Sequence, residues 1–401
     1  MKWIWQNENW PDFEYDPSAL QGGEDQFKIE ASKLIGATSI ITDDQQRAFT
    51  IDLMSEEALK SSRIEGEYLD RDSVIYSLLQ QFKLEPDNNR RLGTDKERGV
   101  AALMADNYRS YSEPLTHERL FLWHPCIVSP SLLVRDVGIY RTSPDDMRVV
   151  SGHEGKEKVH YIAPPSNQVP REMDRFVEWF NDSGPNGKSP LPALTRAGIA
   201  HLYFVSIHPF DDGNGRIARA LSERALADSL GHPGLFALSH VIEANRLEYY
   251  KQLEVTHKGL RIDDWLNYFT KSALEAVGHS QKLARFTVEK TRLFDRVRDQ
   301  INARQEKALV RMFEEGMDGF EGGLSPKKYM AITGSPVATT TRDLQELVAL
   351  GALTKTGKLK GTRYWLNLGQ EFEGEKNKHQ AERSRSAALK ARRSKEGEHS
   401  H

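Results

Sequence analysis

The sequence is short of the features that would place the chain outside the cell or in a membrane. It has one cysteine, Cys126, so no disulfide bond can form within the chain. It contains no run of the roughly 18 apolar residues that a membrane-spanning helix needs. Its amino end, MKWIWQNENW, lacks the apolar core of a signal peptide. We therefore expect a cytoplasmic protein that does not enter a membrane.

Internal repetition is also absent, because no period of about 20–50 residues recurs, and this argues against solenoids and propellers. Composition is that of an ordinary globular protein, with 38% hydrophobic and 28% charged residues. The 401 residues predict two or three domains. Changes of pattern suggest a helical region over 1–95, a mainly helical central region over 114–275, a third region over 295–367 and a basic flexible tail over 368–401.

Several element boundaries are visible in the first half of the chain. Thr42 and Gln45 have the spacing of a capping box. Gly66 suits the end of the helix that begins after Thr42. Thr116 is placed to cap the start of a later helix. Between residues 147 and 165, two short β-branched runs flank a charged, glycine-containing turn, which predicts a hairpin.

One segment, IHPFDDGNGRIARA, combines the parts of a phosphate-binding site. Gly213 and Gly215 allow a tight turn that brings backbone N–H groups close to an anion. The helix that follows adds unpaired amides and the positive end of its dipole. Arg216 and Arg219 are three residues apart, so both can reach the same polyphosphate.

Two further residues of this segment add chemistry to the phosphate site. Asp212 is a hard oxygen ligand suited to Mg²⁺ that bridges phosphate oxygens. His208 precedes the loop and is placed to take a proton from an incoming hydroxyl at neutral pH. These residues predict a nucleotide-transfer site. The alternative, a common Gly-Asn-Asp turn before a helix, does not require two arginines, an acid and a histidine.

The segment resembles the signature of the Fic family, H-P-F-x-[D/E]-G-N-G-R-x-x-R, and matches every specified position. The matching residues are His208, Pro209, Phe210, Asp212, Gly213, Asn214, Gly215, Arg216 and Arg219. The resemblance implies a mainly α protein with the helical Fido fold, which transfers AMP from ATP to a Tyr, Thr or Ser hydroxyl of a target protein or of itself.

The resemblance also implies roles for these residues. The histidine is the general base, Asp212 binds Mg²⁺, the Gly-Asn-Gly loop holds the α- and β-phosphates, and Arg219 positions the γ-phosphate. Gly215 stands where the branch that phosphorylates its targets has lysine, so AMP transfer is expected. Pro209 and Phe210 are expected to be packing anchors.

Two other segments are similar to parts of the family's ATP-binding site. The hairpin with Val149, Val150, Ser151 and Gly152 resembles the family's flap, whose strand edge could pair with a target backbone. The alternative is an ordinary edge hairpin. Tyr249 and Tyr250 lie where the family lines the adenine pocket, although tyrosines at helical spacing are usually core residues. His257 falls where some relatives have asparagine.

The sequence SSRIEGE resembles the family's inhibitory motif through Ser61, Glu65 and Gly66. The resemblance implies that Glu65 binds Arg219 and takes the hydrogen-bonding face that the γ-phosphate needs. Two alternatives stay open: a solvated glutamate at a helix end, and a deAMPylase in which the same glutamate activates water.

Beyond residue 295 the pattern predicts one long helix over 296–316, then a helix-turn-helix followed by a wing. Ser335 is expected to cap the second helix of the motif, with Pro336 at its first position. Three leucines, Leu344, Leu347 and Leu350, would face inward.

This predicted winged helix has features of a nucleic-acid-binding module. The front of its recognition helix would be 339–342, and the wing would carry Lys355, Lys358, Lys360 and Arg363 toward phosphates. DNA binding through the winged helix and the basic tail is one possibility, and a protein-contact or homodimer module is the other. A nucleotide-sensing transcriptional regulator is therefore the rival of an enzyme.

Overall fold

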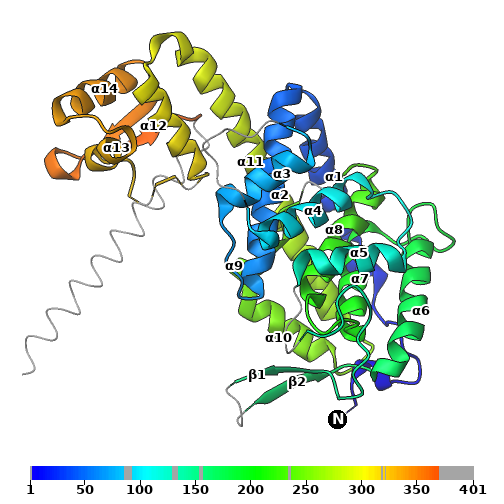
Figure 1. Ribbon diagram of the computed structural model, residues 1–401. Helices are drawn as coiled ribbons and strands as arrows, with labels where there is room; N and C mark the ends of the chain where they lie inside the picture. Colours follow the sequence, from blue (N-terminus) through cyan, green and yellow to red (C-terminus); the bar gives the residue numbers. More distant parts are fainter. Residues whose placement is uncertain are drawn as a thin grey trace, which may run out of the picture. The chain divides into compact units, whose positions relative to one another are not determined.

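The computed structural model describes residues 2–84, 93–128, 134–152, 157–233, 236–317, 319–320 and 322–369 (Figure 1). The protein is mainly α, as predicted. It divides into two compact units, 1–282 and 283–401. Most of the predicted basic tail, 370–401, lies outside the described residues. No helix in the described part of the chain has the length and apolar character needed to cross a membrane.

The first unit contains short 3₁₀ turns at Ile4–Gln6 and Ser166–Gln168 in addition to its longer elements. In chain order these are α1 (Pro17–Ser39), α2 (Asp43–Ile64), α3 (Arg71–Gln81), α4 (Asp95–Arg109), α5 (His117–Ile127), β1 (Arg148–Ser151), β2 (Lys158–Ile162), α6 (Val169–Asp182), α7 (Ala193–Ile207), α8 (Asn214–Leu230), α9 (Leu238–Ala244), α10 (Arg246–Thr256) and α11 (Asp263–Val297). The last helix continues past the boundary between the units.

Helix α7 is the centre of the first unit, and all of its residues from Ala193 to Ile207 are buried. A helix that is apolar on every side must be covered on every side, and α1, α6 and α8 each contact it. The first amides of α7 are bonded by a carboxylate from α1. Glu24 accepts hydrogen bonds from the backbone N–H groups of Leu194, at 3.1 Å, and Thr195, at 2.8 Å.

The predicted helix ends of the first unit are confirmed. Thr42 and Gln45 form a capping box at the start of α2, and the Thr116 hydroxyl accepts the N–H of Arg119 at the start of α5. Helix α2 ends at Ile64, and Gly66 follows with a φ of 83°. That left-handed conformation favours glycine, which has no Cβ to clash. This turn directs the chain after α2 toward the loop between α7 and α8.

The second unit contains α12 (Ala303–Glu314), α13 (Pro326–Thr333), α14 (Val337–Ala349), β3 (Leu353–Thr356) and β4 (Arg363–Leu366), with the two strands antiparallel. The prediction of one helix over 296–316 is wrong, because α11 ends at Val297 and α12 begins at Ala303. Asn302 makes the break. Its side chain accepts the N–H groups of Arg304 and Gln305, as an N-cap does.

Helix α14 begins one residue later than predicted. Pro336 is its N-cap, and the Ser335 hydroxyl bonds the Thr340 hydroxyl at 2.8 Å instead of a backbone amide. Leu344 and Leu347 are fully buried, while Leu350 is half-buried. Thr340 is 1% exposed, so this part of the predicted base-reading segment faces the core. The winged-helix identity of this unit stays a prediction.

Candidate active site

The loop between α7 and α8 starts at a strained position. His208 caps α7 in the left-handed conformation, with φ 52° and ψ 59°, which is uncommon for a residue with a side chain. A buried arginine holds it there. Arg141 Nε donates to the carbonyl of His208 at 2.8 Å, and Arg141 N donates to the carbonyl of Pro209 at 3.0 Å. Nothing in the sequence pattern identified Arg141 as a site residue.

The middle of the loop is closed by the side chain of Asn214. Its Oδ1 accepts the N–H of Phe210 at 3.0 Å and its Nδ2 donates to the Phe210 carbonyl at 2.8 Å. Phe210 is fully buried and stacks on His124, with ring centroids 4.1 Å apart. Gly213 has a φ of 83°, and a Cβ there would lie 3.0 Å from Ile127. Asn214 therefore shapes the loop through its side chain.

The orientation of His208 leaves one imidazole nitrogen for chemistry. Nδ1 lies 3.2 Å from the carbonyl of Val205, which suits a proton on Nδ1. The neutral ring then has a lone pair on Nε2. The pKa of His208 is lowered to about 4, mainly by burial and also by the nearby Arg141 guanidinium, while the Val205 carbonyl, Glu65 and Asp212 oppose this lowering. The imidazole is therefore neutral at pH 7.

The two aspartates of the loop differ in what they bind. Asp211 Oδ2 accepts the backbone N–H groups of Arg135, at 3.0 Å, and Asp136, at 3.2 Å, so it holds a neighbouring segment. The Asp212 side chain is 57% exposed, and one of its oxygens accepts the N–H of Gly213. The other oxygen is 3.5 Å from Arg216. An exposed carboxylate at this turn fits the hard oxygen ligand that Mg²⁺ with ATP requires.

Arg219 is buried against the end of α2, although 158 residues separate it from Ser61. Its Nε donates to the Ser61 hydroxyl and its Nη2 to the Ser61 carbonyl, both at 2.9 Å. Nη2 also donates to Glu65 Oε1 at 2.8 Å. Nη1 is buried and has no hydrogen-bond partner. Burial alone would lower the pKa of Arg219, but the Glu65 carboxylate outweighs it, so the pKa is raised.

Glu65 also occupies the start of α8. A Cβ built on Gly215 would overlap Oε1 of Glu65 and would lie 3.2 Å from Arg219 Nη1. The carboxylate therefore sits directly over the first turn of this helix, where backbone amides and the helix dipole favour an anion. The space for it exists because residue 215 has no side chain.

The sequence analysis missed a second carboxylate beside the motif. Glu67 accepts a hydrogen bond from Arg216 Nη1 and also pairs with Lys96 at 3.1 Å. The available signal was its place two residues after Glu65, beyond the turn at Gly66. The structure thus brings both arginines of the motif against the segment that follows α2.

The two tyrosines of the predicted adenine pocket lie in different surroundings. Tyr249 is 1% exposed, and its hydroxyl lies 2.9 Å from Nε2 of the buried His201. Its ring is core rather than a free face for a base. Tyr250 is 39% exposed, and its hydroxyl donates to the Ile64 carbonyl at 3.2 Å. His257 is buried and stacks on Tyr161, with centroids 3.9 Å apart.

The predicted hairpin is present as the antiparallel pair β1 and β2, with a register shift between Val149 and Val150, and its role as a flap stays a prediction. Val150 is 43% exposed, and Ser151 and Gly152 are exposed. Among the described residues, β1 pairs only with β2, so its other edge is open. Strand β2 is tied to α10, because His160 Nδ1 and Lys158 Nζ lie 2.7 and 2.9 Å from Glu254.

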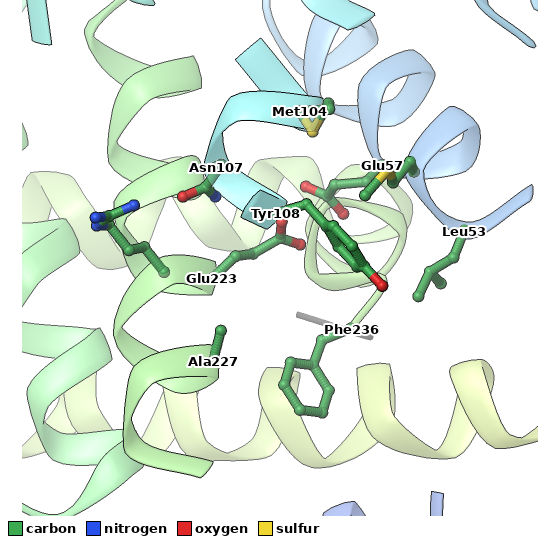
Figure 2. A pocket seen from close by; sticks show the side chains of 10 residues that line it. Leu53, Glu57, Met104, Asn107, Tyr108, Glu223, Ala227 and Phe236 are labelled. Atoms are coloured by element: carbon green, nitrogen blue, oxygen red, sulfur yellow. The ribbon is translucent and has the colours of Figure 1, made fainter. Parts of the chain in front are cut away.

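A pair of buried carboxyl groups lies close to Arg219. Glu57 and Glu223 line a cavity of about 30 Å³, together with Asn107, Tyr108 and Phe236 (Figure 2). Burial raises the pKa of both groups, that of Glu57 to about 7, and the mutual interaction raises that of Glu223 further. Burial and mutual repulsion therefore favour a proton on this pair of carboxyl groups. The Ser239 amide and hydroxyl both donate to Glu57.

Two segments of the chain match models of known protein families. Residues 114–226 match the model of the Fic/DOC family. Residues 3–84 match the model of a domain of unknown function, DUF4172. The Fic/DOC segment includes the loop between α7 and α8, and the DUF4172 segment includes Ser61 and Glu65.

Curated relatives of the chain include protein adenylyltransferases. One, protein adenylyltransferase fic-1 of Caenorhabditis briggsae, is 35% identical over 98 residues, 24% of this chain and 17% of the relative. Protein adenylyltransferase Fic of Drosophila grimshawi is 31% identical over 99 residues, 25% of this chain and 19% of the relative. The match thus spans less than a fifth of the length of these relatives.

Solved structures of Fic proteins are also similar. A Fic family protein from Desulfovibrio desulfuricans G20 has a TM-score of 0.49 and 20% identity, over 90% of this chain and 99% of that chain. Fic-1 from C. elegans has a TM-score of 0.46 and 18% identity, over 66% and 73% of the two chains.

Proposed function

We propose that the protein is an adenylyltransferase that transfers AMP from ATP to a hydroxyl of a protein target or of itself, and that Glu65 restrains this activity. The observation that carries the proposal is the carboxylate of Glu65 on Arg219 at the first turn of α8. A site that holds a carboxylate there has the donors and the dipole that a phosphate needs. The similarity of the Fic/DOC segment to protein adenylyltransferases supports the choice of reaction.

His208 supplies the base in this proposal. Its pKa is lowered to about 4, so Nε2 is free to accept the proton of an incoming hydroxyl at pH 7. The hydroxyl oxygen then forms a bond to the α-phosphorus, and the bond from the α-phosphorus to the bridging oxygen breaks. Pyrophosphate leaves with that bonding pair. Asp212 would hold the Mg²⁺ that accompanies ATP and neutralises its phosphates.

Glu65 restrains the reaction by occupying Arg219. While the Glu65 carboxylate accepts a hydrogen bond from Arg219 Nη2, that N–H group is not available to the terminal phosphate of ATP. The α-phosphate then lacks the in-line alignment with the target hydroxyl that transfer requires. A strand edge of the kind open on β1 suits a target backbone added beside it.

The experiment is transfer of label from α-labelled ATP in Mg²⁺ buffer, with and without cell lysate as a source of targets. We compare the parent chain, Glu65→Gly, and Glu65→Gly combined with His208→Ala. Glu178→Gly serves as the control, because it removes an exposed glutamate from α6. Label should rise sharply with Glu65→Gly, stay at the low parent level with Glu178→Gly, and be lost when His208→Ala is added. Label in none of the chains would contradict the proposal and favour the deAMPylase or the regulator.

A further inference from the structure

A second cluster of ionisable side chains lies outside the site described above and joins three helices of the first unit. Glu56 comes from α2, His240 from α9 and His279 from α11. One ligand atom from each residue lies within 4.8 Å of the other two. The side chains are 22%, 30% and 15% exposed, respectively, so solvent and small ions can reach them.

Both imidazoles converge on the same carboxylate. His279 Nε2 lies 3.0 Å from each oxygen of Glu56, and His240 Nδ1 lies 2.6 Å from Oε1. The contact of His240 is short, yet Nδ1 has no hydrogen-bond partner of acceptable geometry. Three ligand atoms from three helices that converge this closely can bind one metal ion.

The two histidine rings of the cluster lie against each other. The imidazoles of His240 and His279 stack with centroids 3.7 Å apart and an angle of 21° between their planes. A divalent cation bound here would place positive charge beside the Glu56 carboxylate, and metal ligation requires both histidine rings to be neutral.

The donor set selects the class of cation. Two imidazole nitrogens and one carboxylate oxygen suit Zn²⁺ and similar first-row transition metals, whereas Mg²⁺ and Ca²⁺ prefer oxygen ligands. Bonds of about 2.0–2.1 Å in a tetrahedral site separate ligand atoms by about 3.3 Å. The observed separations of 2.6 and 3.0 Å would have to widen by about 0.7 and 0.3 Å, respectively.

We propose that Glu56, His240 and His279 form a binding site for one divalent transition-metal cation of the Zn²⁺ class, with water in the remaining position. Glu56 stands nine residues before Glu65 on the same helix or its end. The bound ion therefore fastens the helix that leads to the Arg219 contact onto α9 and α11. The binding claim itself is independent of the proposed AMP transfer.

The test is calorimetric titration of the full chain with Zn²⁺. Since His399 and His401 could also bind the ion, both are replaced by alanine in every chain tested. We expect one ion per chain, and at least about 100-fold weaker binding for Glu56→Gln and for His279→Ala, because each removes one of three protein ligands. His232→Ala is the matched control and should leave the affinity unchanged, since the His232 ring lies 2.9 Å from the Pro233 carbonyl and does not belong to the cluster.

Two measurements keep the result decisive if a variant folds poorly. Circular dichroism identifies variants that have lost helix, and Glu56→Gln retains the size and hydrogen-bonding capacity of the side chain. Co²⁺ bound to the background chain should give visible ligand-field absorption that Glu56→Gln and His279→Ala lose. Absence of Zn²⁺ binding in the background chain, or equal affinity in the folded variants, would overturn the proposal.

Discussion

Glu67 accepts a hydrogen bond of 2.5 Å from Arg216, and it does so two residues after the glutamate that binds Arg219. One short turn after α2 therefore engages both guanidinium groups of the loop motif. Arg216 is 5% exposed on its side chain, so Glu67 is its main compensating charge, with Asp212 more distant at 3.5 Å. This gives the proposed restraint two contacts instead of one.

Replacing Glu67 by Gln should raise label transfer by about fivefold, because a neutral acceptor binds a guanidinium about 1 kcal/mol more weakly than a carboxylate does. The increase should be smaller than that of Glu65→Gly, since Glu67 does not contact Arg219 in this structure. Transfer from α-labelled ATP measures both. Glu113→Gln, which weakens a surface pair with Arg119, is the control. A decrease with Glu67→Gln would mean that Glu67 assists the reaction.

The effect of Gly215→Ala on the free energy of unfolding should change sign when Glu65 is replaced by glycine. In the parent chain the new methyl group would overlap the Glu65 carboxylate, and we expect a loss of about 1–3 kcal/mol in the free energy of unfolding. In the Glu65→Gly background the overlap is gone, and alanine should stabilise α8 by up to about 1 kcal/mol. Denaturant unfolding of the four chains gives the coupling energy. Equal effects in both backgrounds would show that Glu65 does not occupy this space in solution.

In a plot of the transfer rate against pH, the acidic limb should have its midpoint near pH 4 instead of near the ordinary pKa of histidine. The folded pKa of His208 is lowered to about 4, so the neutral base is present above that pH and is lost as the pH falls through it. The profile is measured as kcat/KM for ATP in Glu65→Gly. Because Glu65 raises the pKa of His208, its removal should move the limb to slightly lower pH. A limb near 6.5 would place His208 in open solvent.

Glu57→Gln should reduce the pH dependence of stability. The folded pKa of Glu57 is raised to about 7 from an ordinary value of 4.5, so the folded state binds the extra proton. The stability linked to that proton is complete below pH 4.5 and is lost as the pH rises toward 7. Unfolding by denaturant at several pH values between about 5 and 8 should show a shallower decline for Glu57→Gln. An unchanged slope would mean that the carboxyl pair does not hold the proton.

The structural features that the sequence predicted correctly depend on residues close together in the chain. Capping boxes, the glycine at 66 and the hairpin all depend on residues a few positions apart, so spacing predicts them. The contact of Glu65 with Arg219 spans 154 residues, yet it was expected because a family resemblance supplied the long-range partner.

The features that were missed depend on three-dimensional packing. Nothing in its own segment distinguishes Arg141, which holds the His208 carbonyl, from a surface arginine. Glu57 and Glu223 look like ordinary polar positions of helices until α2 and α8 are placed together. Tyr249 and Tyr250 are adjacent, but one is buried and the other is not, because neighbouring positions of a helix point in different directions.

The carboxylate of Glu24 on the first amides of α7 bears on how the chain is made. Glu24 is synthesised 170 residues before Leu194, a delay of roughly 10–30 s at typical ribosomal rates. The Glu24 carboxylate has therefore been synthesised before α7 leaves the ribosome. A fragment limited to 114–226 would lack it and would leave those buried donors unbonded, at a cost of about 1–3 kcal/mol for each. Residues 3–84 therefore complete the hydrogen bonding at the start of the central helix of segment 114–226.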